Sequence, residues 1–267
     1  SNGNTGVVTF LDYSGTLAPD ASNAELYDDD GSNKITWFDN IYYSFSGVGA
    51  DDPAETSSWF SVFNDPFPPS FNPPDFTNSN AQFVIVNGHT MTTTQNWAVA
   101  GSLVIKGKLE VAHTCQITGR TNLLGDNSGT IEFTHGNGIF DSDGFFSTDS
   151  NSAGGIVDFS QPGILKLASA TPTLGTDLLF EEGTGTVEYD GTVDQTIYDI
   201  TYSNLEIDGS GDKDVGANLT VGGNLTITNG TLDLTNGGVG NFDLALTGDF
   251  SMAAGSLLAG TSVAHTV

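Results

Sequence analysis

Positive charge is the scarcest property of this sequence. Six Lys and Arg stand against 33 Asp and Glu in 267 residues, which gives a formal net charge of -27. A surface of this sign repels phosphate backbones and anionic lipids, so we expect no nucleic-acid partner. It attracts cations and is typical of surroundings in which salt or divalent ions screen it. The charge therefore favours an extracellular location.

Cysteine and long apolar runs are scarce as well. The single cysteine, Cys115, excludes an internal disulfide, and its alternating surroundings (TCQI) favour a small buried residue over a nucleophile. No apolar stretch reaches the roughly 18 to 20 residues that span a bilayer, so we expect no membrane span. Strong helix formers rarely recur at helical spacing, and helix should therefore be rare.

What the sequence does contain, from about Phe83 onward, is a series of short alternating runs. They are separated by Gly or Asn, and examples are QFVIV, SLVIKG, ILKL and TLDL. Such runs predict strands of about four to six residues joined by tight turns. The ten residues NLTVGGNLTI at 218–227 repeat themselves after six positions, which predicts two successive sides of one coil with GG at the corner.

Longer repeats indicate how the strands stack. A glycine, a β-branched residue, an acid and an aromatic recur at offsets of 26 and 30 residues in GTIEF (129–133), GIVDF (155–159) and GTVEY (185–189). These offsets fit one coil of a parallel β-helix, in which equivalent residues lie above one another. The predicted inward column is Ile131, Val157 and Val187, and the predicted outward row is Glu132, Asp158 and Glu188. We therefore expect an all-β protein with a right-handed parallel β-helix over 81–267.

Residues 1–80 differ from this pattern. Proline bars central strands, so the run NDPFPPSFNPPDF at 64–76 predicts an extended connection. Because an end coil needs a cover, we expect an N-terminal β-rich cap here. Its aromatic residues, including Trp37 and Trp59, have two interpretations: a core over the first coil, or a surface that stacks on sugars or docks another subunit.

Both ends of the chain suggest contacts with other copies or modules. The run GVVTFLDY, with Val7, Val8 and Phe10, offers a strand that pairs with a neighbour's edge. The last residues carry no polar cap sequence, so we expect further modules of a larger protein, or a second copy, to cover the last coil. A head-to-tail contact of this kind does not close and would build a filament.

Several stretches together resemble a known group of proteins. The residues IYYSFSGVGADDPAETSSWFSV (41–62), FVIVNGHTMTTTQNWAVAGSLVIKGKLEV (83–111) and QTIYDITYSNLEI (195–207) resemble β-solenoid modules of large secreted surface proteins of Bacteroidota-type bacteria. The resemblance covers most of the chain from about Ile41. It implies export to the cell surface and a stalk, adhesin or matrix role.

Two acidic turns are candidate calcium sites. Asp28 and Asp30 in DDDG, and Asp141 and Asp143 in DSDG, place carboxylates beside a turn glycine, as oxygen-rich calcium loops do. Neither stretch matches the full calcium-loop pattern, so solvated acidic turns are the alternative. Calcium is the only cofactor that the sequence suggests.

The sequence offers little for catalysis. An enzyme acting on acidic polysaccharides needs basic side chains beside its paired acids, and we find no such constellation, so we expect no enzymatic activity. His89 and His113 would form a metal pair if they stacked in adjacent coils, but no third ligand is identifiable, so structural or surface histidines are the favoured interpretation. His135 is expected in a turn. The favoured function is a non-catalytic stalk or adhesin segment at the cell surface, with further modules or surface glycans as partners. The alternative is a filament subunit, and a polysaccharide-active enzyme comes third.

Overall fold

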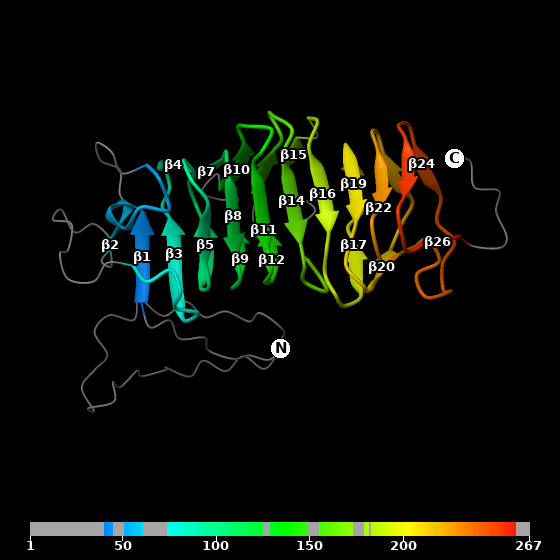
Figure 1. Cartoon of the computed structure of the whole chain (residues 1–267), viewed down its shortest axis with the longest axis horizontal. Helices are drawn as coiled ribbons and strands as arrows, with labels where there is room; N and C mark the ends of the chain where they lie inside the picture. Colours follow the sequence, from blue (N-terminus) through cyan, green and yellow to red (C-terminus); the bar gives the residue numbers. More distant parts are fainter. Residues whose placement is uncertain are drawn as a thin grey trace, which may run out of the picture.

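The fold is a β-solenoid, as the sequence predicted. The computed structural model describes residues 40–44, 51–60, 74–124, 129–148, 155–172, 179–181 and 183–259. Apart from the single 3-10 turn η2 (Thr56–Ser58), every element in these ranges is a strand. The strands stand side by side along one axis, from β1 and β2 at one end to β24 and β26 at the other (Figure 1).

One sheet runs along almost the whole length of the molecule. Its eight parallel strands follow at intervals of one coil, in the order β25-β22-β19-β16-β14-β11-β8-β5. They are β5 (Trp97–Val99), β8 (Thr114–Ile117), β11 (Ile139–Ser142), β14 (Ile164–Leu167), β16 (Thr186–Tyr189), β19 (Asn204–Ile207), β22 (Leu225–Ile227) and β25 (Phe250–Met252).

Four shorter sheets form the other sides. The six-stranded sheet contains β12 (Phe146–Thr148), β9 (Thr121–Leu123), β6 (Ser102–Ile105), β3 (Ala81–Ile85), β1 (Asn40–Ser44) and β2 (Trp59–Phe60). The five-stranded sheet contains β15 (Leu179–Glu181), β13 (Ile156–Asp158), β10 (Thr130–Phe133), β7 (Lys108–Val111) and β4 (Thr90–Thr92). The four-stranded sheet contains β17 (Gln195–Ile197), β20 (Asp212–Val215), β23 (Thr231–Asp233) and β26 (Ser256–Leu258). The three-stranded sheet contains β18 (Thr201–Tyr202), β21 (Leu219–Val221) and β24 (Leu244–Leu246).

A coil therefore consists of three strands, one from each side. β6, β7 and β8 form such a coil, and β20, β21 and β22 form another after the two shorter sheets have replaced the six- and five-stranded ones. The repeat NLTVGGNLTI occupies β21 and β22 with Gly222 and Gly223 at the corner, which confirms the prediction from its six-residue offset.

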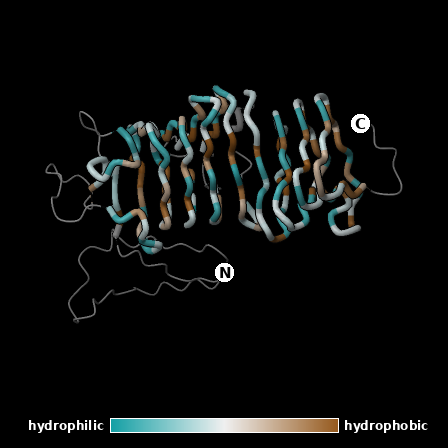
Figure 2. The backbone as a smooth tube through the Cα atoms, viewed as in Figure 1, coloured by the Kyte–Doolittle hydropathy of each residue, from teal (hydrophilic) through white to brown (hydrophobic). Residues whose placement is uncertain are grey.

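The core follows from the alternation of buried and outward side chains in many of the strands. In strands such as β8, β10 and β14, every second side chain is buried, and the tube in Figure 2 changes between hydrophobic and hydrophilic accordingly. The register of the eight-stranded sheet stacks the buried residues into a column, which begins with Trp97, Cys115, Phe140, Leu165 and Val187. Parallel pairing thus places one apolar layer directly on the next.

One predicted column is wrong in its third member. Ile131 and Val157 are partners in the five-stranded sheet, as expected, but Val187 lies in the eight-stranded sheet and pairs with Leu165. The outward row divides in the same way, since Glu132 pairs with Asp158 but Glu188 pairs with Lys166. The reason is that alternation specifies the face of a strand, whereas the number of residues in the intervening turns decides its sheet.

The N-terminal end of the described solenoid is covered by part of the expected cap. β1 adds to β3 in parallel, and β2 adds to β1 in antiparallel orientation. Trp59 on β2 is 5% exposed and stacks on Trp97 at 5.7 Å between ring centroids. Its indole N–H donates to the carbonyl of Pro53 at 2.9 Å. The predicted division at residues 80 and 81 is not tested by these contacts.

Candidate functional site

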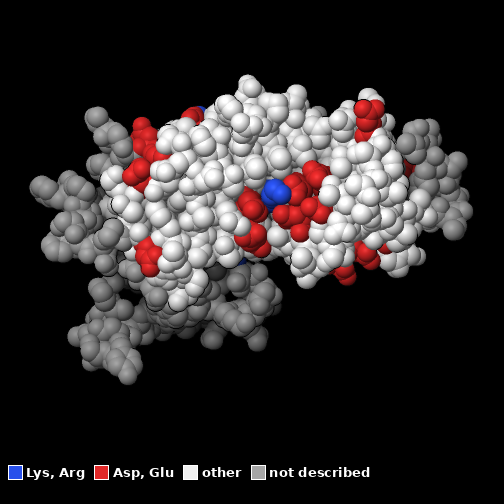
Figure 3. All heavy atoms as spheres, in the orientation of Figure 1, with Lys and Arg blue, Asp and Glu red and all other residues white. Residues whose placement is uncertain are grey.

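The outer face of the eight-stranded sheet gathers charge around one lysine. Lys166 is the only basic residue in these eight strands, and the register places it between Asp141 and Glu188, with Glu206 next in the row. The ammonium of Lys166 lies 2.7 Å from Oε1 of Glu188. Figure 3 shows a basic side chain ringed by acidic ones in the middle of the face that Figure 1 presents. We call these residues, with the row described next, the acidic face.

A second row of carboxylates runs beside the first. Asp143, Asp190 and Asp208 each follow directly after a strand of this sheet, and the backbone N–H of each donates to the preceding coil. Burial raises the pKa of Glu188, and the ammonium of Lys166 opposes this shift. Burial also raises the pKa of Asp190, and the neighbouring carboxylate of Asp141 adds to it. The acidic face therefore holds negative charge at a cost to stability.

The candidate calcium turn DSDG belongs to this face. Burial raises the pKa of Asp141, and the charge of Asp143 raises it further. Asp143 is exposed and accepts a hydrogen bond from the side-chain amide of Gln116 at 3.0 Å. In the ranges that the structure describes, no three Asp, Glu, His or Cys side chains lie close enough to hold a metal ion. Calcium binding here stays a prediction, and Asp28 and Asp30 lie outside the described residues.

The five-stranded sheet carries a smaller charged cluster that the sequence did not reveal. Nζ of Lys108 lies 2.5 Å from Glu110 and 2.8 Å from Glu132. The hydroxyl of Thr92 donates to Glu110 at 2.8 Å. The structure thus places a base beside two outward acids, which sequence reasoning missed because Lys108 and Glu132 belong to different coils.

His89 and His113 do not stack in adjacent coils, so the metal pair that the sequence left open does not form. His89 precedes β4, whereas His113 precedes β8, so they occupy different corners of the solenoid. His89 instead bonds to the hydroxyl of Ser44 at 2.9 Å, and burial lowers its pKa. The two histidines do not align because the length of a coil varies with the length of its corners, so a separation of 24 residues need not correspond to one coil.

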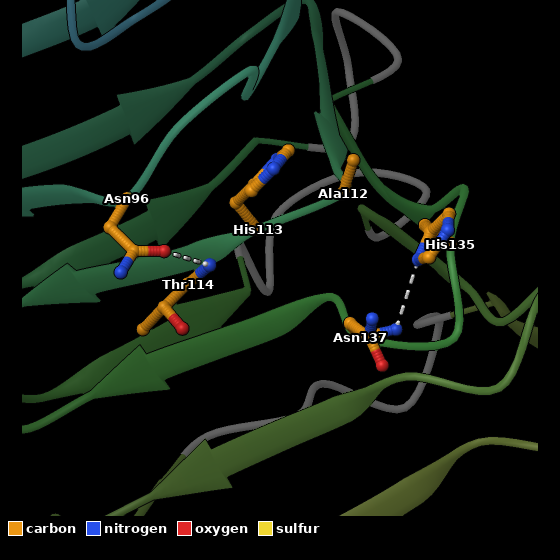
Figure 4. Close-up of a pocket in the computed structure, with 6 residues that line it drawn as sticks. All are labelled: Asn96, Ala112, His113, Thr114, His135 and Asn137. Atoms are coloured by element: carbon orange, nitrogen blue, oxygen red, sulfur yellow. Dashed lines mark hydrogen bonds between the residues drawn. The ribbon is translucent and has the colours of Figure 1, made fainter.

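The structure brings a different pair of histidines to one hollow. His135 lies in the turn before β11, as expected, and the corner that holds it lies against the corner of His113 (Figure 4). The hollow measures ≈ 310 Å³. It is lined by Asn96, Ala112, His113, Thr114, His135 and Asn137. We call it the corner hollow.

Cys115 is buried at 0% exposure between Trp97 and Phe140 in the inward column. Burial raises the pKa of its thiol far above the usual range, because the thiolate would lose its hydration. The cysteine therefore packs as a small apolar residue.

Of the residues that the sequence suggested for an interface, the structure describes only Trp59. Trp59 is buried in the chain's own aromatic cluster, so its indole is a core residue of the covered end and offers no free docking surface. Val7, Val8, Phe10 and Trp37 lie outside the described residues.

The last described coil presents apolar side chains at positions that are buried elsewhere. Phe250 pairs with Leu225, and Met252 pairs with Ile227, so both continue inward columns. Yet Phe250 is 40% exposed and Met252 51%, and Leu258 on β26 is 44% exposed. Within the described ranges no further strand layer lies on these side chains, which accounts for their exposure. We call these three residues the open end.

No protein-family model, curated protein or solved structure matches this chain. The strand pairing shows the β-solenoid by itself, whereas the relation to secreted surface proteins of Bacteroidota-type bacteria stays a prediction from the sequence. Among the described residues, no helix is long and apolar enough to cross a membrane.

Proposed function

We propose that this chain is a structural module of an extracellular surface protein: a stiff spacer whose stacked coils supply length. The observation that carries the proposal is the eight-stranded sheet, in which each strand bonds in parallel to the next without interruption. At about 4.8 Å between neighbouring strands, the seven intervals from β5 to β25 span about 34 Å. Length in such a fold grows with each added coil.

The chemistry of the side chains supports a structural role. Cys115 is enclosed in the core, Glu188 is held by Lys166, and Glu132 is held by Lys108. Corner asparagines connect the coils in the same way, since Oδ1 of Asn204 accepts the N–H of Asn224 and Oδ1 of Asn224 accepts the N–H of Asp249. These groups stabilise the contact between one coil and the next.

A spacer must carry tension along its axis. Such a force loads the hydrogen bonds of all three sides of a coil together, because they run parallel to the axis. We would attach handles through cysteines introduced at Ser57 and Ala245, two exposed positions near opposite ends, and pull in an optical trap. The proposal expects no extension until coils rupture in abrupt steps. Smooth lengthening at low force would contradict it.

End-to-end assembly is a second candidate, and the open end favours it. A second copy, or another solenoid module, that seats a strand layer on Phe250 and Met252 would bury both side chains. The net charge of -27 opposes contact between copies, so assembly should require salt or divalent ions.

Electron microscopy and sedimentation in low and physiological salt test this candidate. We expect fibres or end-paired rods at the higher salt, and we expect Phe250→Asp to abolish them. Val239→Asp is the matched control, because Val239 is 86% exposed in a turn outside the columns. Monomers at every salt concentration would reject self-assembly and leave the spacer proposal standing.

A further inference from the structure

The corner hollow has the size and the polar groups of a small binding site. Its ≈ 310 Å³ is at the lower end of the range of ligand pockets, about 300 to 1,000 Å³. Figure 4 shows Ala112 between the two imidazoles, with Asn96 and Thr114 on one side and Asn137 on the other. The methyl group of Ala112 gives the hollow an apolar wall.

Two hydrogen bonds fix what each imidazole offers to a ligand. Nδ1 of His113 lies 2.9 Å from the carbonyl of Thr93, and since a carbonyl only accepts, this nitrogen carries the hydrogen. Neutral His113 therefore has an accepting Nε2. Nδ1 of His135 accepts the backbone N–H of Asn137 at 3.3 Å, so neutral His135 has a donating Nε2–H. The pair supplies one acceptor and one donor.

The remaining polar side chains add groups of both kinds. Asn96 uses its Oδ1 to accept the N–H of Thr114 at 3.2 Å, which leaves its amide hydrogens to donate. Within the described residues, the hydroxyl of Thr114 and the side-chain amide of Asn137 are engaged by no other group. The hollow thus offers both donors and acceptors beside one apolar wall.

We propose that the corner hollow binds one neutral sugar residue of a glycan. A sugar hydroxyl donates and accepts at once, which matches the presence of both donors and acceptors, and the C–H face of the ring fits against Ala112. None of the six lining residues is an acid, a lysine or an arginine, and the net charge of -27 disfavours an anionic ligand. This activity is independent of the spacer role, because a rod that binds no sugar still supplies length.

The test is a titration of the full chain with simple sugars, in which NMR monitors the resonances of its four imidazoles. The probes are glucose, galactose, mannose and N-acetylglucosamine, since one sugar held by few hydrogen bonds is expected to bind with Kd of about 1 mM. The proposal expects at least one sugar to shift the His113 and His135 resonances together, with His89 unmoved. Absence of any shift at saturating sugar would overturn it. So would a response of both rings to zinc ions but to no sugar.

A pair of variants separates this site from binding elsewhere. Asn137→Ala removes a side-chain amide from the hollow and should weaken binding about three- to tenfold, the loss typical of one hydrogen bond. Asn87→Ala makes the same change in an exposed turn away from the hollow and should leave the affinity unchanged. Equal affinity of the Asn137 variant and the wild type would place the sugar elsewhere and overturn the proposal.

Discussion

Replacing Lys166 by Met tests how the acidic face is held together. The substitution keeps the aliphatic stem but removes the ammonium that lies 2.7 Å from Glu188. The side chain of Glu188 is 5% exposed and that of Lys166 26%, so the pair is neither fully buried nor at the surface. Exposed pairs contribute about 0 to 1 kcal/mol, and loss of one partner from a buried pair costs about 3 to 5 kcal/mol. We expect an intermediate loss, about 2 kcal/mol at pH 8.

The pH dependence has a definite sign. The pKa of Glu188 is raised in the folded protein, chiefly by burial, so the folded state holds its proton more tightly than the unfolded state does. The corresponding stability is present below the ordinary glutamate pKa of 4.5 and is lost as the pH rises through the folded value. Removing Lys166 raises that folded pKa further. The difference between variant and wild type should therefore be small near pH 4 and grow toward pH 8.

Urea unfolding followed by tryptophan fluorescence at several pH values measures this difference. Lys108→Met is the matched control, because Lys108 is 34% exposed and its two glutamates 23% each, so its loss should cost less than about 1 kcal/mol. The reasoning is refuted if Lys166→Met costs under about 0.5 kcal/mol at pH 8, or if its cost does not change with pH.

Three further predictions concern packing. A Cβ on Gly101 would lie 2.1 Å from the backbone oxygen of Ala81, so Gly101→Ala should lower the free energy of unfolding by more than about 2 kcal/mol in the urea assay. A Cβ on Gly216 would have nothing within 4 Å, so the control Gly216→Ala should change this free energy by less than about 0.5 kcal/mol. Cys115 should resist a thiol reagent at pH 8 in the native protein and react after unfolding, and rapid native labelling would contradict its burial. Trp59→Ala should cost about 3 to 5 kcal/mol by thermal and urea unfolding, and a loss below about 1 kcal/mol would show that the covered end does not depend on it.

The sequence was sufficient to predict the solenoid because one local rule repeats along the chain. Alternation determines which side chains of each strand face inward, and Ile131 and Val157 stack as that rule requires. Coil length is not a local property. The partners Trp97 and Cys115 are 18 residues apart, whereas Cys115 and Phe140 are 25 apart, so a constant period cannot assign a strand to its sheet.

The same limit explains the candidate sites. The carboxylate neighbours of Lys166 come from three other coils, and only the register brings them together. The corner hollow depends on turns of unequal length, which place His135 rather than His89 near His113. Spacing in the sequence gives no signal for either arrangement. For Trp59 the sequence left open a core position or a docking surface, and the structure buries its ring against Trp97.

The most direct test of the account is a distance measurement along the eight-stranded sheet. Ala98 and Ser251 are exposed and lie in one outward row, seven strand intervals apart. Spin labels on Ala98→Cys and Ser251→Cys should give one narrow distance distribution, at about 34 Å between attachment points. A second pair, Ala98→Cys with Glu206→Cys, is five intervals apart and should give about 24 Å. A stiff parallel stack predicts both values in that proportion. Broad distributions, or distances that do not scale with the number of coils, would contradict it.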